Sequence, residues 1–213
     1  MTQHADSIIK ARWIIPAEPF NSILDNHALV IHHGHIKAIL PNTQVDKHFT
    51  AKQTHDLKDH ALIPGLINAH THSAMNLFKG LADDLPLMDW LNNHIWPAEQ
   101  KWVNETFVAE GSRLAIAEML KSGVTCFNDM YFFPEQTATV AAEAGIRANI
   151  GMIVIDFPSA WAADANEYFN KGLQLHDNYR DHPLITTSLA PHAPYSVNDD
   201  ALKRVQMLAN ELD

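Results

Sequence analysis

The 213 residues allow one large domain or two small ones, and an apolar fraction of 46% is enough for a sizeable core. Acidic residues outnumber basic ones by 25 to 15, which gives a net charge of −10 with histidine neutral. No basic run interrupts this balance. We therefore expect no nucleic-acid partner, because phosphate neutralisation needs clustered lysine or arginine.

The compartment follows from cysteine usage and the N-terminal segment. The single cysteine, Cys126, cannot form an internal disulfide, which fits a reducing compartment. Residues 1–6 lack the basic start and apolar core of a signal peptide. No apolar stretch is long enough to span a bilayer. We expect a cytoplasmic protein with no membrane contact.

The first third of the chain reads as a small sheet. Short β-like runs cover 8–15, 28–32 and 36–40, and prolines and glycines separate them. We assign residues 1–62 to this first domain.

From residue 63 onward, strands and helices alternate. Strands are expected at 66–69, 124–130, 147–155 and 184–189, and helices at 105–122, 135–144, 162–178 and 199–212. The strands are nearly continuous apolar runs, typical of a parallel sheet that is covered on both faces. We therefore expect four βα units within residues 63–213.

Such alternation fits either an open doubly wound sheet or a (β/α)₈ barrel. No glycine-rich phosphate-binding motif follows any strand, which removes the usual reason to choose the nucleotide-binding sheet. His70 and His72 end the first strand and His192 follows the fourth, and chemistry at strand C-termini suits a barrel. A barrel needs about 250 residues, so about half of one is expected here.

His70 and His72 are the strongest metal-ligand candidates. Side chains two apart on a strand point to the same side, so two imidazoles there supply half of a tetrahedral shell. The chain has 14 histidines, and a second His-x-His arises at His33 and His35. That pair lies around a glycine between two short apolar runs, and a hairpin turn explains it better than a metal site does.

Several segments together resemble a known family. They are residues 63–72 (IPGLINAHTH), 75–84 (MNLFKGLADD), 95–99 (IWPAE), 123–131 (GVTCFNDMY) and 190–196 (APHAPYS). Their combination resembles the amidohydrolase superfamily, in its branch of cyclic-amidine deaminases and chlorohydrolases. Within that branch it is most similar to the N-terminal part of 5-methylthioadenosine/S-adenosylhomocysteine deaminases.

The resemblance implies a role for each of four residues. His70 and His72 would bind one catalytic divalent metal, usually zinc. Glu99 would contact the ribose hydroxyls of a nucleoside substrate, and His192 would contact the substrate beside the metal. Residues 1–62 would form half of a small β-sandwich that the C-terminal end of the full-length protein completes, and that protein is expected to be a homo-oligomer.

Five further residues bear on this pattern. Related deaminases carry a substrate-contacting arginine after the third barrel strand, where this chain has Met152. Asp129 could orient a metal histidine, but a structural role in a turn is favoured, so we leave it out of the site. Trp96, with Pro97 and Trp102, could form an apolar wall near Glu99.

Hydrolytic deamination requires an activated water and a group that moves protons to the leaving ammonia. Zinc lowers the pKa of a bound water to about 7. The family's other two metal ligands and its acid/base glutamate come from later strands. We therefore expect this chain to be an inactive fragment of a longer deaminase, with its catalytic acid/base beyond residue 213.

Two alternatives stay open. The first is a sister enzyme, such as a deaminase of guanine or a similar heterocycle, or a triazine chlorohydrolase. The second is an inactive half-barrel kept as an interaction module.

Overall fold

The computed structural model describes residues 2–212. The chain divides into two compact units, residues 1–64 and 65–213. No helix within the described residues is long and apolar enough to cross a lipid bilayer.

The first unit is a four-stranded sheet with one short helix. It contains β1 (Gln3–Ile14), β2 (Leu24–His32), β3 (His35–Pro41), α1 (Asn42–His48) and β4 (Phe49–Leu62). The strand order is β3-β2-β1-β4, in which β1 pairs antiparallel with β2 and parallel with β4. Its core consists of small and branched side chains: Ala5, Ile8, Ala28, Val30, Val45 and Phe49.

The expected hairpin at the second His-x-His is confirmed. His32 pairs with His35, and the two residues between them, His33 and Gly34, have φ values of 49° and 75°. Positive φ at both central positions is the signature of a type I′ turn. The hairpin turn therefore explains why His33 and His35 lie on either side of Gly34.

Strand β4 was missed in the sequence. Most of its side chains are polar and exposed, so it carries neither an apolar run nor a clear alternation. Pairing along nearly the whole of β1 holds it in place instead.

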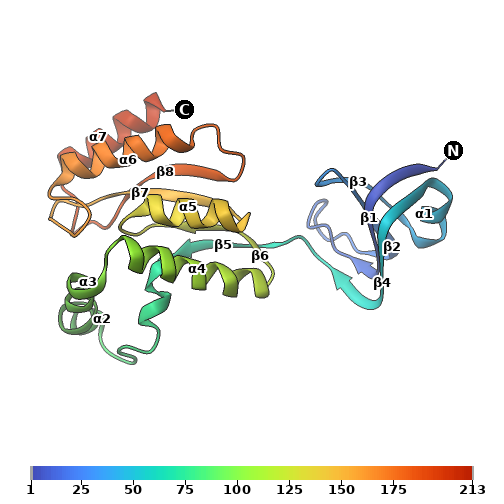
Figure 1. Cartoon of the computed structure of the whole chain (residues 1–213), viewed down its shortest axis with the longest axis horizontal. Helices are drawn as coiled ribbons and strands as arrows, with labels where there is room; N and C mark the ends of the chain where they lie inside the picture. The colour runs from blue at the N-terminus through green and yellow to red at the C-terminus, as the bar shows by residue number, and fades with distance from the viewer. Residues whose placement is uncertain (1, 213) are drawn as a thin grey trace. The chain divides into compact units, whose positions relative to one another are not determined.

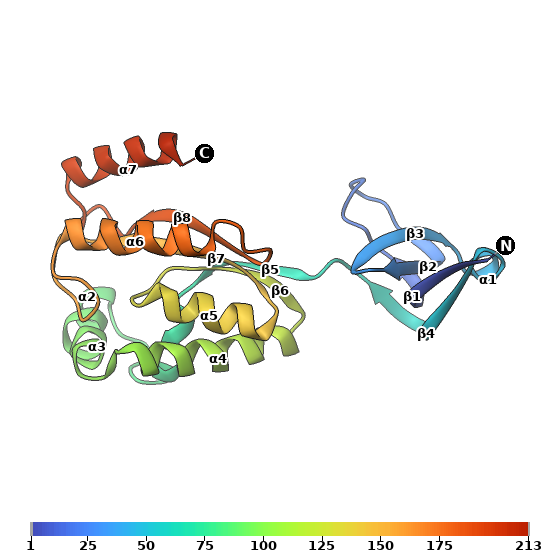
Figure 2. The same ribbon diagram turned by 45° about the horizontal axis from the view of Figure 1, so that its top comes forward.

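The second unit alternates strands with helices (Figures 1 and 2). Its strands are β5 (Leu66–Thr71), β6 (Val124–Asp129), β7 (Arg147–Val154) and β8 (Ile185–Pro191), all parallel and in the order β5-β6-β7-β8. The main helices are α4 (Glu105–Lys121), α5 (Pro134–Ala144), α6 (Ala165–Tyr179) and α7 (Asp199–Glu211). The expected elements are confirmed with their ends moved by a few residues.

Between β5 and α4 lies a helical stretch that the sequence reading left unassigned. It consists of the 3₁₀ helix η1 (Ser73–Phe78), α2 (Leu87–Trp90), the π-helical turn η2 (Leu91–Ile95) and α3 (Trp96–Trp102). None of these segments is longer than seven residues, so no amphipathic period has room to develop.

The two faces of the parallel sheet differ. Toward the helices, Phe127, Ile150 and Ile185 pack in one apolar cluster with residues of α4, α5 and α6. On the opposite face, Asn149 donates hydrogen bonds to Asn128 Oδ1 at 2.5 Å and to Ser188 Oγ at 2.8 Å. Strand residues alternate between the helix layer and this polar ladder, and cover on both faces stays a prediction.

This asymmetry bears on the two architectures that the alternation left open. A doubly wound sheet has helices on both faces, whereas α4, α5 and α6 pack on one side of this sheet. Helices on one side of a parallel sheet are the arrangement of a β/α barrel wall.

Gly111 in α4 offers a test of how η1 is positioned. A Cβ at this residue would overlap the backbone carbonyl of Ala74. We expect Gly111→Ala to lower the free energy of unfolding by about 1–3 kcal/mol through overpacking. Helix propensity alone predicts a gain of about 1 kcal/mol. Urea unfolding followed by circular dichroism distinguishes the two signs.

Gly172→Ala in α6 is the matched control. Its Cβ would lie 3.0 Å from the Cβ of Met152, a milder approach than the one at Gly111. We expect a smaller loss there, and a Gly111→Ala variant as stable as the wild type would contradict the packing described here.

Candidate active site

His72 lies directly after β5, and its hydrogen bond fixes which ring nitrogen is free. Its Nδ1 is 2.6 Å from the carbonyl oxygen of Met130. A carbonyl only accepts, so Nδ1 carries a hydrogen, and in the neutral ring Nε2 is the nitrogen with the lone pair. The same arrangement orients metal-binding histidines in many proteins.

His70 lies beside this ring. The two imidazole centroids are 5.1 Å apart and the rings are nearly perpendicular. His70 is exposed at the end of β5, whereas His72 is half-buried. The spacing agrees with the convergence expected for alternate residues of one strand.

Asp129, the last residue of β6, is buried and fixes the chain on both sides of His72. Its Oδ1 accepts from the Thr71 hydroxyl at 2.7 Å and from the Ser73 backbone N–H at 2.6 Å. Burial raises the pKa of this carboxyl, and the hydrogen bonds from Ser73 and Thr71 oppose that rise. Asp129 thus holds the backbone on both sides of His72 from the end of a strand, and the turn expected for it was wrong.

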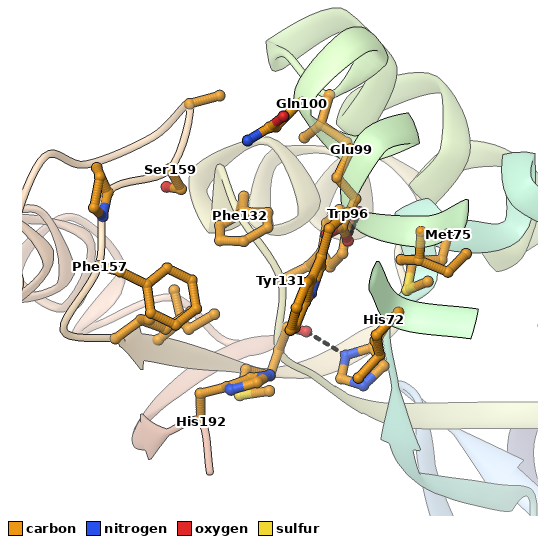
Figure 3. A pocket seen from close by; sticks show the side chains of 18 of the residues that line it. His72, Met75, Trp96, Glu99, Gln100, Tyr131, Phe132, Phe157, Ser159 and His192 are labelled. Carbon is orange, nitrogen blue, oxygen red and sulfur yellow. Dashed lines mark hydrogen bonds between the residues drawn. The ribbon is translucent and has the colours of Figure 1, made fainter. Parts of the chain in front are cut away.

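A cavity of about 490 Å³ contains three of the four predicted site residues, His72, Glu99 and His192. Figure 3 shows Glu99, Tyr131 and His72 on one side of it and His192 on another. Most of the remaining wall is apolar: Trp90, Leu91, Ile95, Trp96, Val103, Phe132, Ile153, Ile155 and Phe157. Such a volume with a few polar groups suits a small organic ligand.

Glu99 lies on α3 and accepts a hydrogen bond from the Tyr131 hydroxyl at 2.7 Å. Burial raises the pKa of its carboxyl, while the Tyr131 hydroxyl and His72 oppose the rise. Trp96 lines the cavity beside Glu99 as expected. Trp102 does not belong to this wall, since it lies half-exposed among the residues of a separate shallow depression.

His192 follows β8, and its backbone N–H donates to Val154 at 3.1 Å. Its Nδ1 is 2.8 Å from Ser196 Oγ, and the Ser196 hydroxyl donates to the carbonyl of Ala193 at 3.1 Å. Because that hydroxyl has one hydrogen, His192 Nδ1–H is the donor and Nε2 is an acceptor. Burial, assisted by His72, lowers the pKa of His192, which favours the neutral ring.

Met152, the residue matched to the arginine of related deaminases, does not line the cavity. Its side chain is buried in the cluster between β7 and the helices, with its Cβ facing Gly172 of α6. The neighbouring residue Ile153 lines the cavity instead. The one-residue alternation of a strand explains the difference.

Three potential metal ligands, one carboxylate and two imidazoles, also lie together in the first unit. Single ligand atoms of Asp6, His32 and His33 are within 4.8 Å of one another. The Asp6 carboxylate already accepts from Lys52 Nζ and from the His33 backbone N–H, both at 2.7 Å. These contacts lower the pKa of Asp6 and account for the cluster without a metal.

Comparison with known proteins adds to this geometry. The model of the amidohydrolase family matches residues 61–213. This chain belongs to the amidohydrolase family. The family resemblance drawn from the sequence motifs is thereby confirmed.

Two proteins illustrate the similarity. The 5-methylthioadenosine/S-adenosylhomocysteine deaminase of Saccharophagus degradans is 53% identical over 208 residues, which cover 98% of this chain and 47% of that protein. The crystal structure of an adenosine deaminase from Xanthomonas campestris with bound zinc has a TM-score of 0.98 at 48% identity, over 100% of this chain and 48% of that one.

A third likeness is to the crystal structure of atrazine chlorohydrolase from Arthrobacter aurescens complexed with zinc. It has a TM-score of 0.83 over 96% of this chain and 51% of that one, at 17% identity, so it supports the shared fold alone. The amidohydrolase-type α/β fold is confirmed, and the chain spans about half the length of the curated relatives it matches.

The hydrogen bonds of Asp129 give a test of the site's framework. We expect Asp129→Ala to lower the free energy of unfolding by about 1–3 kcal/mol, because the buried Ser73 N–H loses its acceptor. Urea unfolding measures the loss, and a variant as stable as the wild type would contradict this role.

Asp129→Asn is the control, because it keeps an acceptor oxygen and removes the charge. The folded-state pKa of Asp129 lies above its ordinary value of 3.8, so the folded state holds a proton more tightly than the unfolded state does. The aspartate's contribution to stability therefore declines as pH rises above 3.8. The stability difference should shift in favour of Asp129→Asn between about pH 4 and about pH 7.

Proposed function

We propose that this chain is the N-terminal part of a zinc-dependent hydrolytic deaminase of adenosine-type nucleosides, with 5-methylthioadenosine and S-adenosylhomocysteine as its substrates. The proposal rests first on the cavity that brings together His72, Glu99 and His192. The activities named for the Saccharophagus and Xanthomonas proteins support the substrate class.

The donor set fits a zinc site in part. Imidazole nitrogens are ordinary zinc ligands, and the Met130 carbonyl leaves Nε2 of His72 available with its lone pair. His70 and His72 would hold the ion, and zinc, when bound, supplies the Lewis acidity that activates water near neutral pH. The zinc named for the Xanthomonas structure supports this metal.

Glu99 and His192 would bind and orient the nucleoside. A carboxylate has lone pairs for both hydroxyls of a ribose diol, which suits Glu99. The Nε2 lone pair of His192 can accept a hydrogen bond from the substrate. Trp96 and Phe132 offer apolar area on which a purine can pack.

In the net reaction, the oxygen of water bonds to the amino-bearing carbon of the base and the carbon–nitrogen bond breaks. One proton of the water completes the leaving ammonia, and the other ends on the ring nitrogen next to the new carbonyl group. We assign no proton-transfer residue within the chain, and we place that group and the remaining metal ligands in a later segment. In this proposal residues 63–213 form the first four units of a (β/α)₈ barrel and residues 1–62 form part of a β-sandwich.

The sister hydrolases are the second candidate. A carboxylate that binds a diol favours ribosides over guanine or chlorotriazines, which have no ribose. The inactive half-barrel module has only the length of the chain in its favour.

Ammonia release by the zinc-loaded full-length protein tests the proposal. We expect turnover of methylthioadenosine and S-adenosylhomocysteine, and none of guanine or atrazine. His72→Ala should lower kcat/KM at least about 100-fold, since the metal loses a ligand. His35→Ala is the matched control, because its imidazole is exposed in the first unit and should leave turnover unchanged.

Three results would contradict the proposal in different ways. Turnover of guanine or atrazine alone would favour the sister hydrolases. No turnover and no bound zinc would favour the interaction module. Full turnover by the 213-residue chain alone would overturn the assignment of the acid/base group to a later segment.

A further inference from the structure

Tyr131 has a buried hydroxyl that the proposed reaction does not use. The residue is 4% exposed. It lies two positions after Asp129, the last residue of β6. Burial, together with the nearby carboxylate of Glu99, raises the pKa of this phenol, so it keeps its proton. The hydroxyl is therefore a permanent hydrogen-bond donor within the cavity wall.

That donor is directed at Glu99. The Tyr131 hydroxyl lies 2.7 Å from Glu99 Oε1, a short distance typical of a hydrogen bond to a carboxylate. Glu99 belongs to α3, a helix of seven residues, and is separated from Tyr131 by 32 residues along the chain. The contact therefore joins two elements of the cavity wall that are far apart in the sequence.

The contact restricts Glu99 without consuming its binding capacity. A carboxylate can accept about four hydrogen bonds. The phenol takes one on Oε1 and leaves Oε2 available for the hydroxyls of a diol. A glutamate side chain loses rotamer freedom when it binds, and holding it in advance reduces that cost on association.

The same chain segment also orients the metal-ligand candidate. The Met130 carbonyl accepts from His72 Nδ1, and the next residue along the chain donates to Glu99. Asp129, one residue earlier, is buried and holds Thr71 and Ser73. Three consecutive residues thus set the positions of His72 and Glu99 relative to each other.

We propose that Tyr131 is a positioning residue that holds the Glu99 carboxylate in place, at a separation from His72 set by the same chain segment, so that Glu99 is ordered before it binds a ribose diol. This inference rests on the proposed function. It predicts an effect on substrates that carry the diol and none on those that lack it.

Steady-state kinetics of Tyr131→Phe in the zinc-loaded full-length protein test the inference. We expect KM for methylthioadenosine to rise about tenfold while kcat changes less than about twofold, because a hydrogen bond to a charged group is lost. KM for 2′,3′-dideoxyadenosine, which lacks both hydroxyls, should stay unchanged. In a Glu99→Gln background, Tyr131→Phe should add little to the loss.

Tyr179→Phe is the matched control. It removes a partly buried tyrosine hydroxyl that lies 3.1 Å from the Thr139 hydroxyl, between α5 and α6. Its KM for both substrates should equal that of the wild type.

The outcomes separate this inference from the function it rests on. Equal KM increases for the diol and dideoxy substrates would mean that Tyr131 only supports packing, and would overturn the inference. An unchanged KM for methylthioadenosine would overturn it as well. A wild-type protein that deaminates no nucleoside would overturn the proposed function, and the inference with it.

Discussion

The buried carboxylate of Asp129 is the constraint on which the rest of the candidate site depends. It ties the end of β6 to the residues on both sides of His72, which lie on the neighbouring strand and the start of η1. Burying a carboxylate is costly unless it is hydrogen-bonded, and the two donors offset part of that cost. Because these bonds hold β5 and β6 together, the carbonyl of Met130 reaches His72 and the hydroxyl of Tyr131 reaches Glu99.

The fold was largely predictable because its strands and longer helices have strong local signals. Asn104 accepts from the Phe107 N–H at the start of α4, and Gly123 and Gly145 have positive φ where α4 and α5 end. The signals failed where segments are short or polar. Strand β4 is held by pairing with β1, and the polar ladder at Asn149 needs partners on neighbouring strands that no local pattern displays.

The site was predictable in its residues more than in its connections. His72, Glu99 and His192 line one cavity, but the sequence offered no signal that Tyr131 contacts Glu99 across 32 positions. The position of Tyr131, two residues after the C-terminal end of β6, was the available clue. The metal and substrate roles of His70, His72, Glu99 and His192 stay predictions, as do the homo-oligomer, the cytoplasmic location and the absence of nucleic-acid binding.

The polar ladder from Asn128 through Asn149 to Ser188 has a consequence for how such a chain matures. Its members hydrogen-bond to one another across three strands, so this face can meet water with few unsatisfied groups. A growing polypeptide can therefore pack α4, α5 and α6 onto one face of the sheet while the ladder on the other face stays hydrated. Exposed apolar surface is what makes partly folded intermediates aggregate, and the ladder reduces it during translation.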